Sequence, residues 1–179
     1  MEKYIFNTKR LRVRQFIAND KDHFIELLSD PEIINPVPQR KFSAEEISQQ
    51  FKDFSSYANN VLKEKRTVWA ITKINQSEVI GLCALLTNDE DDRELAYRFR
   101  TKYWGNGYGT EIAQGLIDYS FNDLKLDKIT ADVNVENIGS VKILEKFLVP
   151  VREFYNESDQ CTDRRYILKN TKGNNNKQS

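Results

Sequence analysis

The sequence predicts one α/β (α+β) domain built around a mixed, mostly antiparallel and twisted sheet of about six to seven strands. Three observations lead to this class. Short runs with strand periodicity recur along the chain, segments with helical periodicity interrupt them, and neither a repeat nor a linker divides the 179 residues. Residues 1–170 are therefore expected to form the domain, with helices on both faces of the sheet, and residues 171–179 a flexible polar tail.

The first predicted element is a strand around Leu11 and Val13. These apolar residues alternate with Arg10, Arg12 and Arg14, which is the period-two pattern of a half-buried strand. The three arginines would share one face of the strand, and such a stripe is more often solvated than a binding patch.

Two helices are expected next. Asp20 is placed as the N-cap of a segment whose apolar residues share one helical face, namely Phe24, Leu27 and Leu28. Several prolines then break the chain into a loop over residues 30–38. Ser43 and Glu46 form a capping-box pattern, and behind it apolar residues recur at helical spacing: Ile47, Phe51, Phe54 and Ala58.

The rest of the chain predicts a strand meander followed by alternating helices and strands. A hairpin is predicted from two segments rich in β-branched and apolar residues, Thr67–Ile74 and Glu78–Thr87, with a short polar turn between them. Glu94–Arg100 is predicted as a further strand. The further expected elements are a helix over Thr110–Phe121, a strand over Lys128–Val133, a helix over Ser140–Lys146, and strands over Val151–Tyr155 and Arg165–Leu168.

Composition excludes several classes of function. Lysine plus arginine and aspartate plus glutamate both number 27, so the net charge of zero offers no general field for nucleic acid or an anionic membrane. His23 is the single histidine, and Cys83 and Cys161 lie far apart, which argues against a histidine-dependent triad or a metal site. Because no apolar run is long enough to span a bilayer, we expect a cytoplasmic protein.

The stretch Tyr103–Glu111 is the most informative part of the chain. Gly105, Gly107 and Gly109 stand between a predicted strand and a predicted helix. Glycines permit positive φ, and free N–H groups in the first turn of a helix suit a phosphate or pyrophosphate. The spacing fits neither a P-loop nor a dinucleotide-binding motif. A glycine-rich turn that binds nothing would show the same spacing, as would an unrelated nucleotide-phosphate binder.

This stretch resembles motif A of the GNAT acetyltransferases, in the "YWGKGYATEA" form of the RimJ/RimL-like branch. Five further segments resemble that branch in the same order: Thr8–Arg14, Ser29–Ile33, Val79–Gly81, Glu94–Tyr97 and Asn137–Lys146. The resemblance therefore extends from about residue 8 to residue 168.

The resemblance implies acetyl-CoA as cosubstrate. Its pyrophosphate would lie on the backbone N–H groups of Gly105, Asn106, Gly107, Tyr108, Gly109 and Thr110. Its pantetheine arm would lie in a V-shaped gap between the fourth and fifth strands, Glu94–Arg100 and Lys128–Val133, where the backbone of Phe99 would pair with it. Asn137 would hydrogen-bond the same arm.

The expected reaction is direct attack of a primary amine on the thioester, which requires a proton acceptor and a proton donor. Glu94 is the candidate base, although it reads equally well as an exposed strand carboxylate. Many family members have a tyrosine donor seven residues after the Asn137 position, where this chain has Leu144. The resemblance implies Ser140 as the candidate donor instead, because it occupies the position that supplies the hydroxyl in the RimJ/RimL-like branch. Ser140 also reads as a plain helix N-cap.

A second departure from the family lies after Lys146, where the usual helix-ending glycine is missing. Pro150 is expected to stop that helix instead. This departure leaves open a protein that binds acetyl-CoA but catalyses poorly, such as an acyl-CoA-binding sensor or regulatory module.

The acceptor is expected to be an amine of a small molecule or a protein N-terminus. The family places its two early helices, about residues 20–62, beside the acceptor pocket, so Phe51, Phe54 and Tyr57 are candidates for its wall. The acidic turn at residues 88–92 weakly favours a cationic amine. An exposed sheet edge would allow a homodimer.

Overall fold

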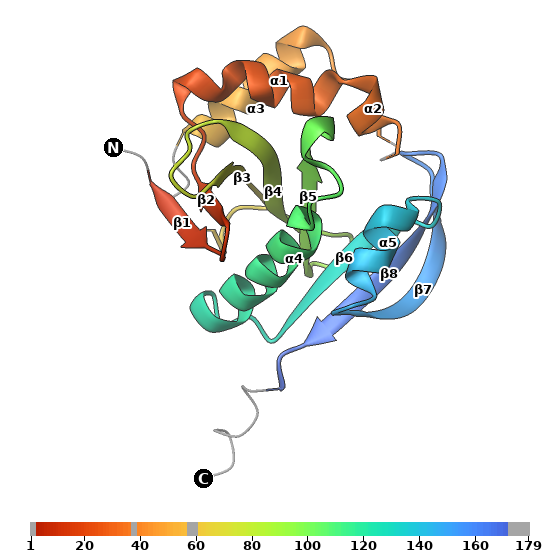
Figure 1. Ribbon diagram of the computed structural model, residues 1–179. Helices are drawn as coiled ribbons and strands as arrows, with labels where there is room; N and C mark the ends of the chain where they lie inside the picture. Colours follow the sequence, from red (N-terminus) through yellow and green to blue (C-terminus); the bar gives the residue numbers. More distant parts are fainter. Residues whose placement is uncertain (1–2, 37–38, 57–60, 172–179) are drawn as a thin grey trace.

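The computed structural model describes residues 3–36, 39–56 and 61–171 and shows one sheet flanked by helices (Figure 1). The strands are β1 (Tyr4–Asn7), β2 (Leu11–Arg14), β3 (Arg66–Lys73), β4 (Val79–Thr87), β5 (Arg93–Phe99), β6 (Lys128–Asn134), β7 (Val149–Asn156) and β8 (Cys161–Lys169). The helices are α1 (Lys21–Ser29), α2 (Pro31–Ile34), α3 (Ala44–Ser55), α4 (Tyr108–Asp118) and α5 (Ile138–Leu144). From residue 172 on, the predicted tail lies outside the described residues.

The strand order across the sheet is β1-β2-β3-β4-β5-β6-β8-β7, and every pairing is antiparallel except β5 with β6. The predicted fold class is confirmed, but the expected six to seven strands are corrected to eight. The prediction missed β1, because its four residues at the edge of the sheet are too few to show a clear alternation. No described helix is long and apolar enough to cross a membrane.

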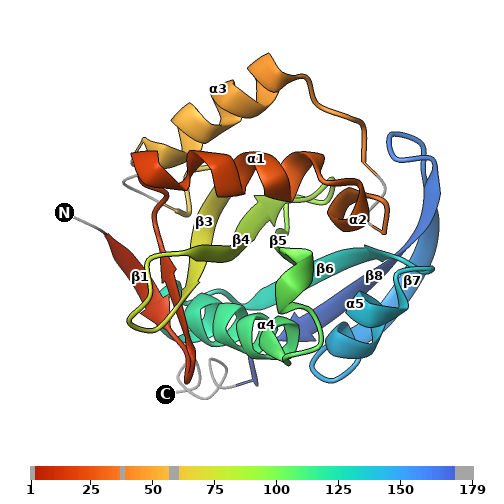
Figure 2. The ribbon, with the colours of Figure 1, turned by 45° about the horizontal axis from the view of Figure 1, so that its top comes forward.

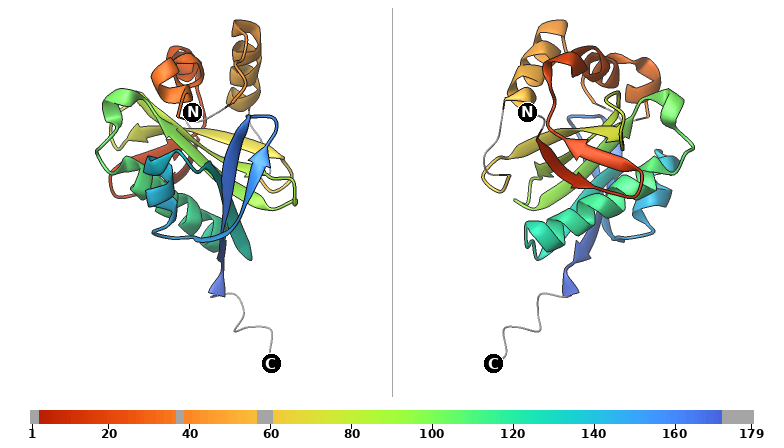
Figure 3. Two further views of the ribbon diagram at one scale, coloured as in Figure 1. Left: turned by 90° about the vertical axis from the view of Figure 1, so that its right-hand side faces the viewer. Right: turned by 60° about the vertical axis from the view of Figure 1, so that its left-hand side comes forward.

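Helices cover both faces of the sheet, as expected (Figures 2 and 3). One core lies against α4 and α5, and a second lies against α1 and α3. Alternate residues of β4 enter different cores: Cys83 and Leu85 belong to the first, whereas Leu82 and Ala84 belong to the second. The centre of the sheet therefore has no solvated face, so its strands read as continuous apolar runs.

The arginine stripe is solvated only in part, which corrects the expectation: Arg10 is exposed, Arg12 is half-buried and Arg14 is buried. Arg14 is 1% exposed and donates to both carboxylate oxygens of Asp20, at 2.6 and 3.0 Å. Asp20 makes no side-chain cap bond to α1 and instead accepts from the N–H of Ile17 at 2.8 Å. Asp20 is the N-cap residue of α1, as predicted, but its side chain does not cap the helix because the buried guanidinium of Arg14 takes the carboxylate.

Two other helix ends test the predicted signals. The capping box of α3 is confirmed, since Ser43 and Glu46 each bond the other's backbone N–H. Helix α5 ends at Leu144, whose carbonyl accepts from the N–H groups of Phe147 and Leu148 in a tight turn. Pro150 does not stop this helix: it lies inside β7, beside an irregular register.

The parallel neighbours β5 and β6 diverge along their length. In the part of the chain described, their single registered pair is Glu94 with Thr130. The Thr130 hydroxyl closes this end of the V by donating to the Arg93 carbonyl at 3.1 Å. The predicted splay is therefore present, and the missed first strand makes it the gap between the fifth and sixth strands.

Candidate active site

A sharp glycine turn leads from β5 into α4. Gly105 and Gly107 have φ of +74° and +77°, a region that favours glycine, and Gly107 is the N-cap of the helix. A Cβ on Gly109 would lie 2.8 Å from Cδ1 of Ile143, so this third glycine permits close packing of α4 on α5. The first N–H groups of α4 have no acceptor within the helix, which makes this turn a suitable cradle for an anion.

The start of the chain holds this turn in place. Glu111, in the first turn of α4, accepts from the Thr8 hydroxyl at 2.5 Å and from the Arg10 backbone N–H at 2.7 Å. The Arg10 guanidinium donates to Glu111 at 2.6 Å and to the carbonyl of Asn106 at 3.0 Å, and stacks over Tyr108 at 4.6 Å. Burial raises the pKa of Glu111, but these bonds outweigh burial and lower it. Sequence reasoning missed this role of Arg10, although the resembling segment Thr8–Arg14 was a signal for it.

A second cluster fixes the other end of the turn. Lys102, Tyr103 and Arg100 all donate to the carboxylate of Glu78, at 2.7 to 2.8 Å. Their hydrogen bonds hold the pKa of Glu78 at about 2. The strand end and the turn are thus tied to the β3–β4 hairpin.

The backbone of Phe99 faces the V-shaped gap. Because the N–H of Arg100 bonds the Ile80 carbonyl, the ladder's alternation turns the N–H and carbonyl of Phe99 away from β4 and toward β6. Its carbonyl accepts from the indole N–H of Trp104 at 2.8 Å. The N–H is the group of Phe99 that remains for a ligand in the gap.

Two cavities meet at this gap. One, of about 500 Å³, lies along the glycine turn, and the other, of about 360 Å³, lies between the sheet and the helices α1 and α3. The two cavities have five lining residues in common: Pro36, Tyr97, Arg98, Asn137 and Ser140. Of the expected pocket-wall residues, Phe54 lines the second cavity, Phe51 is buried in the core beneath it, and Tyr57 lies outside the described residues.

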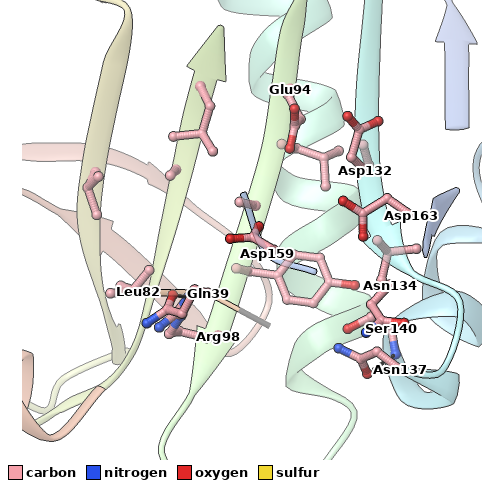
Figure 4. Close-up of a pocket in the computed structure, with 18 of the residues that line it drawn as sticks. Gln39, Leu82, Glu94, Arg98, Asp132, Asn134, Asn137, Ser140, Asp159 and Asp163 are labelled. Carbon is pink, nitrogen blue, oxygen red and sulfur yellow. Dashed lines mark hydrogen bonds between the residues drawn. The ribbon is translucent and has the colours of Figure 1, made fainter. Parts of the chain in front are cut away.

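Glu94 lines the second cavity and is half-buried, so the reading as an exposed carboxylate is corrected (Figure 4). Burial, together with the nearby charge of Asp132, raises the pKa of Glu94 to about 8, against the opposing effect of Arg165. A carboxyl group with such a pKa can exchange a proton near neutral pH.

Ser140 and Asn137 lie where the two cavities join (Figure 4). The helix N-cap is Asn137, whose side-chain oxygen accepts the N–H of Ser140 at 3.3 Å. Asn137, and not Ser140, is therefore the residue that caps this helix. The Ser140 hydroxyl does not serve as the helix cap.

Tyr97 is a residue that sequence reasoning missed. It lines both cavities, and its buried hydroxyl finds no hydrogen-bond partner within the described part of the chain. Burial raises the pKa of Tyr97, and neighbouring Ser140 opposes that shift. Its place on β5, between Glu94 and Phe99, was the available signal.

Nowhere in residues 3–36, 39–56 and 61–171 do three or more His, Cys, Asp or Glu side chains form a group that could hold a metal.

Comparison with known proteins identifies the family. The family model described as "Acetyltransferase (GNAT) domain" matches residues 10–147. The chain belongs to the GNAT acetyltransferase family. Within it, this N-acetyltransferase is similar to the "Uncharacterized N-acetyltransferase p20" of Bacillus licheniformis, with 33% identity over 76% of this chain and 77% of the relative.

Solved GNAT structures have the same fold. An acetyltransferase from Bacillus anthracis superposes with a TM-score of 0.77 and 22% identity, over 93% of this chain and 98% of the other. A spermidine N-acetyltransferase from Vibrio cholerae, in complex with CoA and spermine, superposes with a TM-score of 0.73 and 19% identity, over 89% and 95%. The fold of this GNAT chain is thus one that solved acetyltransferases share.

Proposed function

We propose that this GNAT protein uses acetyl-CoA to acetylate a primary amine of a small molecule or a protein N-terminus. The observation that carries the proposal is the meeting of two cavities at Tyr97, Asn137 and Ser140. One cavity runs to an anion cradle and the other to a carboxyl group of raised pKa. The acyl donor and the acceptor amine would therefore enter by different routes and meet at the gap.

The residues of the turn suit the donor. The N–H groups from Gly105 to Thr110 would hold the pyrophosphate, and the positive end of the α4 dipole favours the same charge. The N–H of Phe99, facing the gap, would bond the pantetheine arm, and so would the amide NH₂ of Asn137. Lys146 donates to the Thr110 hydroxyl at 3.2 Å and adds positive charge beside the cradle.

Glu94 is proposed as the base. The attacking amine must be neutral, and Glu94 would take its proton directly or through a water molecule. A backbone N–H group of β5 near Phe99 would stabilise the oxyanion that forms when the amine nitrogen bonds to the thioester carbon. The C–S bond then breaks, and Ser140, with the buried Tyr97 hydroxyl beside it, would supply a proton or hydrogen bond to the thiolate.

The first experiment is calorimetric titration of the full chain with acetyl-CoA, with ATP and NAD as controls. We expect micromolar binding of acetyl-CoA alone, lost in Gly107→Val, because φ of +77° disfavours a side chain there. Thermal unfolding of the variant separates a lost site from a lost fold, and Arg10→Ala provides a milder second variant.

The outcomes separate the competing functions. Thiol release from acetyl-CoA in the presence of an amine supports the transferase. Tight binding without thiol release across a broad amine panel supports an acyl-CoA sensor instead. Binding of ATP or NAD in place of acetyl-CoA would refute the proposal.

A further inference from the structure

The floor of the second cavity is a patch of the sheet with a small centre and charged corners. Across β3, β4 and β5, the neighbours in the middle row are Val68, Ala84 and Ala96. Arg66 and Glu94 lie in the next row, on either side of β4. Arg98 stands on the same face as Glu94, four residues along β5 and about 13 Å away between Cα atoms.

Arg98 is held firmly but has no counter-ion. Its guanidinium donates to the Leu27 carbonyl at 3.1 Å and to the side-chain oxygen of Gln39 at 2.8 Å. Within the described ranges it forms no ion pair with a carboxylate. Burial, and then the charge of Arg66, lower the pKa of Arg98 to about 10. A half-buried cation fixed by neutral acceptors leaves its charge available to a ligand.

Arg66 brings a second cation to the same cavity, from a more exposed position at the start of β3. It stacks over the ring of Phe54 at 5.0 Å, and none of the described carboxylates pairs with it. Two like charges beside one cavity repel each other, and an anion between them would relieve that repulsion.

The opposite side of the cavity is acidic. Figure 4 shows the carboxylates of Glu94, Asp132 and Asp163 on one side and Arg98 with Gln39 on the other. Asp132 is already paired with Arg165, at 2.6 Å, whereas no ion pair is seen for Glu94 in the described chain. The cavity is therefore bipolar, with carboxyl groups beside the gap and Arg98 at the end beneath α1.

We propose that the acceptor is a small primary amine that also carries a carboxylate, with the amine toward Glu94 and the carboxylate toward Arg66 and Arg98. This inference rests on the proposed transferase function. It replaces the weak expectation of a purely cationic amine, because the acidic turn at residues 88–92 is engaged with Arg152 and Arg165. The row of small residues between Glu94 and Arg98 leaves room for an apolar spacer.

The test uses three matched series of acceptors of equal chain length: ω-amino acids, alkylamines and α,ω-diamines. Thiol release from acetyl-CoA gives kcat and KM for each. We expect the highest kcat/KM for an ω-amino acid. Arg98→Gln and Arg66→Gln should each raise its KM roughly 10- to 100-fold through loss of a charge-assisted hydrogen bond. Both variants should raise KM for the alkylamine of the same length far less than KM for the ω-amino acid.

Arg164→Gln is the matched control, since that guanidinium pairs with Glu153 on β7 and lines neither cavity. Preference for diamines over ω-amino acids, or equal loss for all three series in Arg98→Gln, overturns the inference. If none of the three series is acetylated, ω-amino acids are titrated calorimetrically into the CoA-saturated protein. Absence of binding in that titration overturns the inference about the acceptor. Failure to bind acetyl-CoA at all refutes the proposed function instead.

Discussion

Glu94 is a carboxyl group whose protonation depends on its surroundings. With a pKa raised to about 8, it is mostly protonated at neutral pH and becomes a base above that value. The rate of acetylation at saturating substrates should therefore rise with pH through about 8. Glu94→Gln should lower kcat by roughly 100-fold or more and flatten the pH profile. Steady-state kinetics from pH 6 to 10 measure both, and an unchanged profile in the variant would rule out this base.

The same burial affects stability. The pKa of Glu94 is higher in the folded chain than in the unfolded chain, so its contribution to stability is full below about pH 4.5 and is lost as pH rises through about 8. Glu94→Gln should therefore gain melting temperature relative to the wild type above pH 8 and lose this advantage near pH 4.5. Thermal unfolding across this range tests the sign, and a difference independent of pH contradicts it.

Ser140 and Tyr97 are adjacent hydroxyl groups at the junction of the cavities. If they assist the leaving thiolate, Ser140→Ala and Tyr97→Phe should each lower kcat, by roughly 100-fold for the group that supplies the proton. The Kd for acetyl-CoA should stay unchanged. Tyr155→Phe is a control, because its hydroxyl lies on exposed β7. Full activity in both variants would show that solvent supplies the proton.

The sequence singled out some of these candidate residues and not others. Glu94, Ser140 and Asn137 stood out because family segments surround them. Burial of Arg14 with Asp20, and the missing partner of Tyr97, depend on contacts between residues distant in sequence. No local pattern carries that information.

At the scale of elements, the glycine turn depends on the strand that anchors it. Arg10 ties β2 to the first turn of α4 through Glu111 and to the turn itself through the Asn106 carbonyl. Arg10→Ala should weaken acetyl-CoA binding roughly 10-fold, because the cradle loses two hydrogen bonds that hold its shape. Calorimetry measures the Kd, and Arg12→Ala, two residues further along in β2, is the control. Equal weakening in both variants would indicate a general effect on β2.

Periodicity and capping predicted most elements and their order. The capping box of α3 and the glycines before α4 are local signals, and they were correct. β1 was missed and α5 was misplaced by two residues, because sheet pairing and tight turns set those limits. The divergence of β5 and β6 came only from family resemblance, since no local pattern encodes a gap.

At the scale of the whole molecule, the buried ion pair of Arg14 and Asp20 joins the sheet to the segment before α1. Asp20→Ala leaves a cation buried without its partner and should lower the free energy of unfolding by about 3–5 kcal/mol. Urea unfolding measures this loss. Arg40→Ala removes only the exposed pair with Glu46 and leaves the capping box intact, so it should cost far less. Similar losses in the two variants would contradict the argument.

The V between β5 and β6 divides the sheet into two blocks, β1–β5 and β6–β8–β7, that share one registered pair. A ligand that is hydrogen-bonded to both β5 and β6 would therefore connect the two blocks across the gap. Saturation with acetyl-CoA should slow amide hydrogen exchange along β5 and β6 as well as at the glycine turn, and raise the melting temperature. The rigidity of the enzyme would then depend on how fully its donor site is loaded.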